Sequence, residues 1–180
     1  MRPIKSLGKL VAIATAFSLS GCGMFSSNQR ESEKPMGEAS LLGSWRMEIG
    51  GIYRDLTPVV VADGVLFTNA ESLQLGLVNG WIVAGSGLPL AMSQFRVTEE
   101  GQAIRLVTNF GRWVARCDTP TQRLLEIHQQ CWVSERDKLL PVRRGKKVDR
   151  AGLVVSSWMS LSPSGPILYL ENQALEEDAK

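Results

Sequence analysis

The sequence predicts an all-β domain, a single antiparallel barrel or sandwich of about nine or ten strands that follows a flexible tether. Three observations predict it: short apolar runs that alternate with polar residues, glycine-containing turns between these runs, and no convincing helical stripe in any long stretch. The chain has 180 residues, of which 44% are hydrophobic and 21% charged. This composition fits one globular domain and excludes collagen-like, coiled-coil and wholly disordered chains.

The first expected strand lies within residues 43–49 and shows the alternation directly. Its apolar side chains share one face and its charged side chains the other: Trp45, Met47 and Ile49 against Arg46 and Glu48. Hairpin turns are expected at Gly50-Gly51, Asp63-Gly64 and Asn79-Gly80, each between apolar runs. Further strands are expected at 94–98, 103–108, 112–117, 153–161 and 167–170. For residues 120–130 a helix that begins at Pro120 is the alternative, but the apolar spacing favours a strand.

The first 22 residues carry a targeting signal. A short basic stretch that ends at Lys9 precedes an apolar run, residues 10–19, that is too short to span a bilayer comfortably. The following Leu19-Ser20-Gly21-Cys22 resembles the lipobox of bacterial lipoproteins: an apolar residue, two small residues and a cysteine. An ordinary signal peptide or membrane anchor with an accidental cysteine is the alternative. The resemblance implies that the Cys22 thiol takes the lipid, palmitate included, and that cleavage occurs just before it.

The lipoprotein resemblance also implies a location. Gly23, rather than Asp, follows the cysteine, which in similar lipoproteins generally permits export to the outer membrane, here with the domain facing the periplasm. Several acyl chains bury enough methylene groups for lasting attachment. Loss of the leader removes Arg2, Lys5 and Lys9 from the 20 basic residues that oppose 18 acidic ones. The mature chain is then near neutral, so overall charge gives no case for nucleic-acid binding.

Composition divides the chain into four expected segments. These are a lipoprotein signal peptide (1–21), the acylated Cys22 with a polar tether (22–40), a β-rich globular domain (41–172) and an acidic tail (173–180). The tether lacks apolar periodicity and contains Pro35 and Gly37, which suits a flexible link that lifts the domain off the membrane. We expect the tail to be mobile and give it no role.

Two cysteines remain in the domain, Cys117 and Cys131. The oxidising exported compartment favours a disulfide between them, which would contribute about 3 kcal/mol for a loop of about 15 residues. Such a bridge requires a wide loop, a contact between neighbouring strands or a kinked turn; the alternative is two buried thiols. A metal site that combines them with His128 lacks a fourth ligand, so we expect no metal and no cofactor.

We expect no catalytic residues and no enzymatic activity. The single histidine, His128, shares its expected strand face with Glu126 and Gln130, as a surface residue would. No G-x-S-x-G nucleophile elbow occurs. An envelope hydrolase is the least favoured hypothesis, and it predicts that His128 bonds a serine, cysteine or carboxylate in a cleft.

The sharpest local charge feature is a basic stretch around Gly145. It consists of Arg143, Arg144, Lys146 and Lys147. We expect these side chains at a hairpin tip, where they would contact an anion: lipid A phosphates, an acidic glycan or an acidic partner. The alternative is a solvated turn without a ligand. Aromatic residues are absent from this stretch, which weakens a nucleic-acid reading further.

Gly43-Ser44-Trp45 is similar to the G-x-W motif of lipocalins, in which the tryptophan closes the base of an eight-stranded ligand-binding cup. No T-D-Y triplet and no arginine after Arg150 accompany it. The resemblance implies an apolar cavity lined or floored by four aromatic residues: Trp45, Trp81, Phe95 and Trp113. The alternative is that these rings fill the core.

The leading hypothesis is a non-enzymatic outer-membrane lipoprotein. Its domain would bind or support an envelope component, such as an envelope protein, a glycan or lipopolysaccharide, or a secretion-type assembly. Exposed strand edges and the 143–147 stretch are the expected contact surfaces. A lipocalin-like carrier of an apolar ligand is the second hypothesis.

Overall fold

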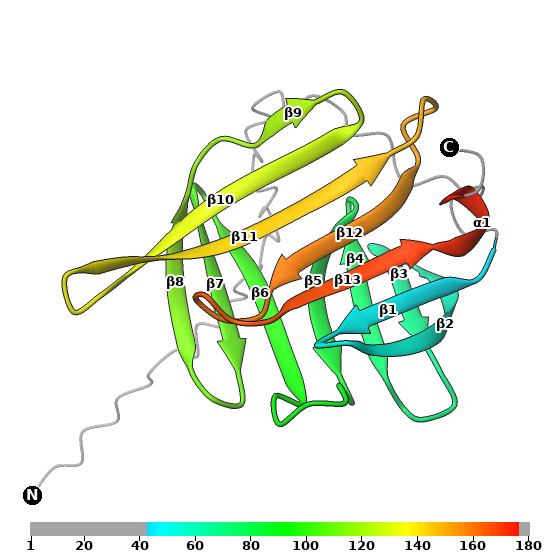
Figure 1. The fold of residues 1–180 in the computed structure, drawn as a ribbon, viewed down its shortest axis with the longest axis horizontal. Coiled ribbons are helices and arrows are strands. Elements are labelled where there is room, and N and C mark those ends of the chain that lie inside the picture. The colour runs from blue at the N-terminus through cyan, green and yellow to red at the C-terminus, as the bar shows by residue number, and fades with distance from the viewer. Residues whose placement is uncertain (1–42, 177–180) are drawn as a thin grey trace, which may run out of the picture. The chain divides into compact units, whose positions relative to one another are not determined.

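Thirteen antiparallel strands and one short helix make up residues 43–176, the part of the chain that this computed structural model describes (Figure 1). The elements are β1 (Trp45–Ile49), β2 (Ile52–Val61), β3 (Gly64–Thr68), β4 (Gln74–Val78), β5 (Trp81–Ser86), β6 (Gln94–Glu100), β7 (Ala103–Thr108), β8 (Arg112–Cys117), β9 (Thr121–Arg123), β10 (Glu126–Glu135), β11 (Lys138–Val148), β12 (Val154–Ser160), β13 (Ile167–Asn172) and α1 (Gln173–Glu176). The expected signal peptide, Cys22 and the tether lie outside the described residues.

The strands close into a barrel. Following the hydrogen-bonded neighbours from β11 through β12, β13 and β1–β8 leads to β10, which pairs with β11 again. The closed ring has 12 strands, and β9 is an extra strand that pairs with the start of β10. The all-β prediction is therefore confirmed and the barrel is the correct alternative, although it has more strands than the nine or ten expected.

Two walls of the barrel are distinct in Figure 1. Strands β10–β13 and β1 form the wall nearest the viewer, and β3–β8 form the far wall, which crosses it at a steep angle. The two walls meet at the β4–β5 turn, where a Cβ atom on Gly80 would lie 2.6 Å from Cγ2 of Val154. The barrel is therefore flattened, and only glycine fits at this contact.

The predicted turns form where the sequence placed them. Gly50-Gly51 joins β1 to β2 and Asn79-Gly80 joins β4 to β5, and all four residues have positive φ angles. Two-residue hairpins prefer this conformation because its twist matches that of the flanking strands. The Asp63-Gly64 signal is also confirmed, since β2 and β3 form a hairpin there.

Alternation directs apolar side chains of most strands of the closed ring into the barrel, whereas β9 is exposed throughout. In β1 the side chains of Trp45, Met47 and Ile49 are fully buried, as expected, while Arg46 faces outward. The Trp45 indole packs against Phe67 of β3, with ring centroids 4.8 Å apart. Apolar side chains from both walls form one continuous cluster, which is the core that holds the barrel together.

The disulfide between Cys117 and Cys131 is present, with an S–S distance of 2.01 Å. The two cysteines lie opposite each other on β8 and β10, and the intervening chain makes room by forming the separate β9–β10 hairpin. The bridge therefore forms by a contact between neighbouring strands, and the chain between the two cysteines is a wide loop, two of the three arrangements expected above. Residues 120–130 are extended rather than helical, as expected, but they form a hairpin: a turn at residues 124 and 125 separates β9 from β10, where a single strand was predicted.

The first residues of the expected tail, Gln173 and Ala174, are hydrogen-bonded to the domain. Asn172 Oδ1 accepts a hydrogen bond from the Ala174 N–H, and the Gln173 N–H donates to the carbonyl of Ser44. These bonds hold the helical turn α1 against the first strand, so the ordered domain extends past residue 172. Within residues 43–176 no helix has the length and apolarity needed to cross a membrane.

Candidate functional site

The basic stretch is not a hairpin tip. Residues 143–147 lie inside the long strand β11, hydrogen-bonded to β10 on one side and β12 on the other. A strand sends successive side chains to opposite faces, so Arg143 is exposed outside the barrel while Arg144 and Lys146 are buried inside it. Lys147 returns to the outer face. The expected cluster of four cations is therefore split between two environments.

Arg144 is buried because it is paired. Its side chain is 5% exposed; Nε donates to Oε1 of Gln129 at 2.7 Å and Nη2 donates to Oε1 of Glu99 at 2.8 Å. Its guanidinium carbon also lies 4.5 Å from the centre of the Trp81 ring, a cation–π contact. These contacts tie β11 to β6 and β5 across the barrel, which is a structural role.

Lys146 makes a second link of the same kind. Its Nζ donates to the carbonyl of Asn79 at 2.7 Å and lies 5.0 Å from the centre of the Trp81 ring. The inward-facing cations thus clamp the β4–β5 turn against β11. Of the four residues expected to contact an anion, only Arg143 and Lys147 are on the outer surface.

The four aromatic residues expected around an apolar cavity do not surround one. Trp45 and Phe95 belong to the packed core, Trp113 is half-buried against it, and Trp81 supports the two inward-facing cations. The closed ring also has 12 strands rather than the eight of a lipocalin cup. The rings are used to fill and brace the interior, the alternative stated for them above.

A different aromatic group lies on the outside of the barrel. It is centred on Trp158 of β12, which lies across the neighbouring strand at Gly145. A Cβ atom at Gly145 would be 2.5 Å from the indole Cε2 and Cζ2 atoms, so only glycine leaves room for the ring. The indole therefore rests on the backbone of β11, and it remains half-buried rather than covered.

Strand register places further side chains around Trp158 in two rows. The first row runs across five strands through Glu48, Tyr169, Trp158, Gly145 and His128. The second row, one side-chain repeat away, runs through Arg46, Glu171, Ser156, Lys147 and Glu126. Trp158 has Tyr169 on one side, with centroids 6.4 Å apart, and His128 on the other, at 5.7 Å. We call the outward-facing residues Glu48, Glu126, His128, Lys147, Ser156, Trp158, Tyr169 and Glu171 the aromatic face.

The aromatic face encloses a hollow of about 330 Å³ on the wall nearest the viewer in Figure 1. A volume of this size lies at the lower end of the range for small-ligand sites. Within the described part of the chain, the carboxylate of Glu48 and the ammonium of Lys147 have neither a hydrogen-bond nor an ion-pair partner. The hollow therefore combines an aromatic floor with two charged groups of opposite sign, Glu48 and Lys147, that are open to a ligand.

His128 lies at the edge of the aromatic face. This position is compatible with the expected surface residue and with the hydrolase hypothesis. Its Nε2 is 3.0 Å from Oε2 of Glu126, and both side chains are well exposed. Among residues 43–176, the imidazole contacts that carboxylate and the Trp158 ring, and it has no bond to a hydroxyl or thiol. The sulfur atoms of Cys117 and Cys131 are committed to the disulfide. The geometry therefore gives the pair an orienting contact without a nucleophile.

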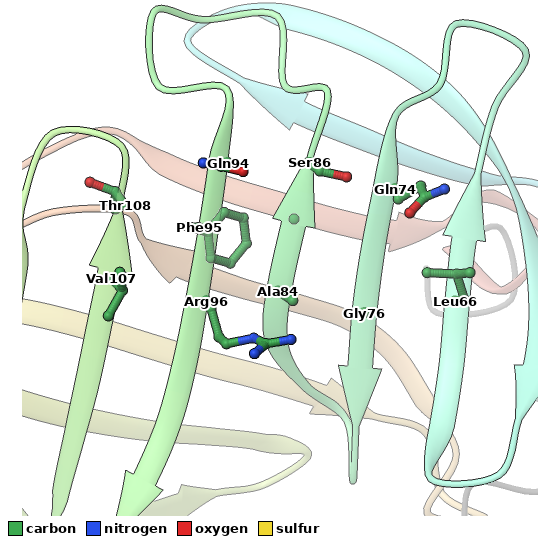
Figure 2. A pocket seen from close by; sticks show the side chains of 11 residues that line it. Leu66, Gln74, Gly76, Ala84, Ser86, Gln94, Phe95, Arg96, Val107 and Thr108 are labelled. Atoms are coloured by element: carbon green, nitrogen blue, oxygen red, sulfur yellow. The ribbon is translucent and has the colours of Figure 1, made fainter.

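A second hollow, of about 370 Å³, lies over β3–β7 on the far wall (Figure 2). Small residues form its floor, among them Gly76, Ala84 and Ser86, and the Arg96 side chain extends toward Ala84 on the neighbouring strand (Figure 2). Phe95 lines this hollow but is 4% exposed and belongs to the core. The second hollow thus lacks the exposed aromatic ring that distinguishes the aromatic face.

Comparison of the chain with protein-family models, curated proteins and solved structures gave no match.

The alternation of two strands is a sequence signal for the aromatic face. The expected strands 153–161 and 167–170 alternate so that Met159, Leu168 and Leu170 face inward. The same alternation places Trp158 and Tyr169 on the outer, polar faces of both strands. Large aromatic residues on the solvent side of two strands mark a candidate binding surface.

Proposed function

We propose that this chain is a non-enzymatic lipoprotein of the outer membrane, anchored through Cys22, whose barrel binds an envelope component on the aromatic face. The observation that carries the binding role is the half-buried Trp158 indole, which lies against Gly145 on the outer face of the barrel and is bordered by polar side chains. A tryptophan that served only stability would gain more from full burial in the core than from this partly buried position.

Two properties of the barrel favour surface binding over the other hypotheses. Its interior holds one connected cluster of buried apolar side chains, which supports a packed core over a lipocalin-like cup. Among residues 43–176, His128 has a carboxylate partner and no bonded hydroxyl or thiol, which favours binding over hydrolysis. A closed sheet with a partly exposed aromatic floor is suited to hold a ligand at its surface.

The proposed location at the outer membrane rests on the sequence. The Leu19–Cys22 motif would supply the lipid, and the polar residues 22–40 would let the barrel reach components at some distance from the bilayer. Facing the periplasm, the aromatic face would meet the cell wall and the inner leaflet of the outer membrane.

Cells that express the full chain are expected to incorporate radiolabelled palmitate into it, and the Cys22→Ser variant is expected to show background labelling only. The physical reason is that the Cys22 thiol is the proposed acceptor of the lipid. A Cys117→Ser/Cys131→Ser variant, which retains Cys22, is the matched control and should label like the natural chain. Equal labelling of the Cys22→Ser variant would contradict the anchor.

Binding is tested separately with the Cys22→Ser protein, which removes the proposed anchor. This protein is expected to sediment with purified cell envelopes, and adding Trp158→Ala and Tyr169→Ala should lower the sedimented fraction at least fivefold. Trp132→Ala is the matched control, because Trp132 is also half-buried and faces outward but lies outside the hollow. Equal sedimentation of the Trp158→Ala/Tyr169→Ala protein would overturn the proposed binding role.

A further inference from the structure

We infer that the ligand of the aromatic face is a neutral saccharide, a chain of hexose or N-acetylhexosamine units. This inference rests on the proposed function and names the chemical class of the ligand. It follows from three features of the face: an aromatic floor, the spacing between its two rows, and the near balance of its charges.

The first feature is the floor. Because Gly145 has no side chain, the Trp158 indole lies over the backbone of β11, where any Cβ atom would meet its ring carbons at 2.5 Å. Tyr169 continues this surface at 6.4 Å with an interplanar angle of 38°. A sugar ring presents C–H groups on its flat faces, and these are attracted to the electron-rich face of an aromatic ring. A row of tilted rings offers a platform for such a face rather than an enclosing cage for a cation.

The second feature is the spacing. The second row lies two residues along each strand, about 6.6–6.8 Å from the first. A sugar ring seated on Trp158 would direct its peripheral hydroxyl groups over that distance toward Ser156, Lys147 and Glu171. Carboxylates accept hydrogen bonds from hydroxyl groups, the ammonium donates to hydroxyl and carbonyl oxygens, and the serine does both. The second row can therefore satisfy a ligand that carries donors and acceptors around a flat body.

The third feature is charge. The hollow is lined by three carboxylates, Glu48, Glu126 and Glu171, and by two lysines, Lys146 and Lys147. Because charges of both signs are present and nearly balance, an anionic ligand such as a phosphate, sulfate or uronate group would meet the carboxylates as well as the lysines. Lys147, in the centre of the second row, in turn opposes a cationic ligand. A neutral ligand with many hydroxyl groups avoids both costs.

Titration of the Cys22→Ser protein with two neutral probes tests this inference. The β-1,4-linked tetramer of N-acetylglucosamine represents glycan backbones of the cell wall, and maltotetraose represents the hexoses of surface polysaccharides. We expect calorimetry to show saturation by at least one of them with a Kd below about 10 mM. The preferred probe distinguishes the two sources. Glucose 6-phosphate and tetramethylammonium, the anionic and cationic probes, are expected to bind at least tenfold more weakly.

Variants of the floor must change this binding. Trp158→Ala should weaken the preferred probe at least tenfold, and Gly145→Ala should weaken it as well because the added Cβ displaces the indole. Trp132→Ala should leave the affinity within twofold, and circular dichroism and thermal unfolding verify that each variant is folded. The inference is wrong if neither neutral probe binds, if a charged probe binds more tightly, or if Trp158→Ala binds equally well. Envelope sedimentation that still depends on Trp158 would then leave the proposed function standing with a ligand of another class.

Discussion

Replacement of Trp45 by alanine is expected to lower the free energy of unfolding by about 3–5 kcal/mol, the cost of removing a large aromatic side chain from a packed core. The Trp45 side chain is completely buried and packs against Phe67 with ring centroids 4.8 Å apart. The flanking strands β2 and β13 hold the backbone at this position from both sides, so the surroundings collapse only partly into the space left behind. Urea unfolding followed by circular dichroism measures the loss.

Trp45→Phe is the matched comparison. The indole Nε1 is buried without a hydrogen-bond partner, and such an unsatisfied donor is itself destabilising. Phenylalanine removes this donor and keeps most of the apolar contact with Phe67, so we expect a clearly smaller loss than for alanine. A loss below about 1 kcal/mol for Trp45→Ala would mean that the indole borders empty or hydrated space, as the base of a ligand-binding cup would.

Local signals in the sequence were sufficient for the first part of the barrel. The Gly50-Gly51 and Asn79-Gly80 pairs determine two tight hairpins, and the alternation in residues 43–49 determines which face of β1 is buried. Each of these features depends on residues that are close in sequence. The strand ladder that they generate follows directly, because hairpins place consecutive strands side by side.

Strand β11 was not predictable in the same way. Four basic residues around Gly145 have the composition of a solvated turn, and the strand is formed because β10 and β12 offer ladder partners on both sides. The burial of Arg144 further requires Glu99, which is 45 residues away in the chain. Contacts at this separation have no local sequence signal, so the inward-facing cations and the closure of the barrel become visible only in the structure.

The aromatic face likewise depends partly on local sequence and partly on contacts between residues that are distant in sequence. That Trp158 and Tyr169 point away from the core follows from alternation within their own strands. That they meet Glu48, Lys147 and His128 follows from the register of five strands. Register is a collective property, since a slip of one residue would send a whole strand's side chains to the opposite face. The sequence can therefore nominate the rings but not assemble the site.

Removal of the disulfide by Cys117→Ala/Cys131→Ala is expected to lower the free energy of unfolding by about 3 kcal/mol, the loop-closure value for a bridge of this span. Loss of the disulfide should weaken the pairing of β8 with β10 more than the number of residues in the closed loop suggests. Within the described strands, β8 pairs directly with β10 at only two positions, Cys117–Cys131 and Arg116–Trp132. This is the shortest ladder in the closed ring, and one of its two residue pairs is the disulfide itself. Urea unfolding measures the global loss, and amide hydrogen exchange measures the opening of this seam.

The exchange pattern separates a seam effect from general loosening. The Asp118 amide donates to the carbonyl of Gln130 beside the bridge, at 2.9 Å, and it should exchange much faster in the variant. Amides of the β2–β3 ladder, on the opposite side of the ring, should change only as far as the global stability changes. The natural protein treated with a reductant keeps both thiols in place, and it should reproduce the seam opening if the covalent link is the cause. If amide exchange instead became faster by the same factor in all strands, core packing would be what holds β8 and β10 together. The bridge would then stabilise the protein only by lowering the conformational entropy of the unfolded chain.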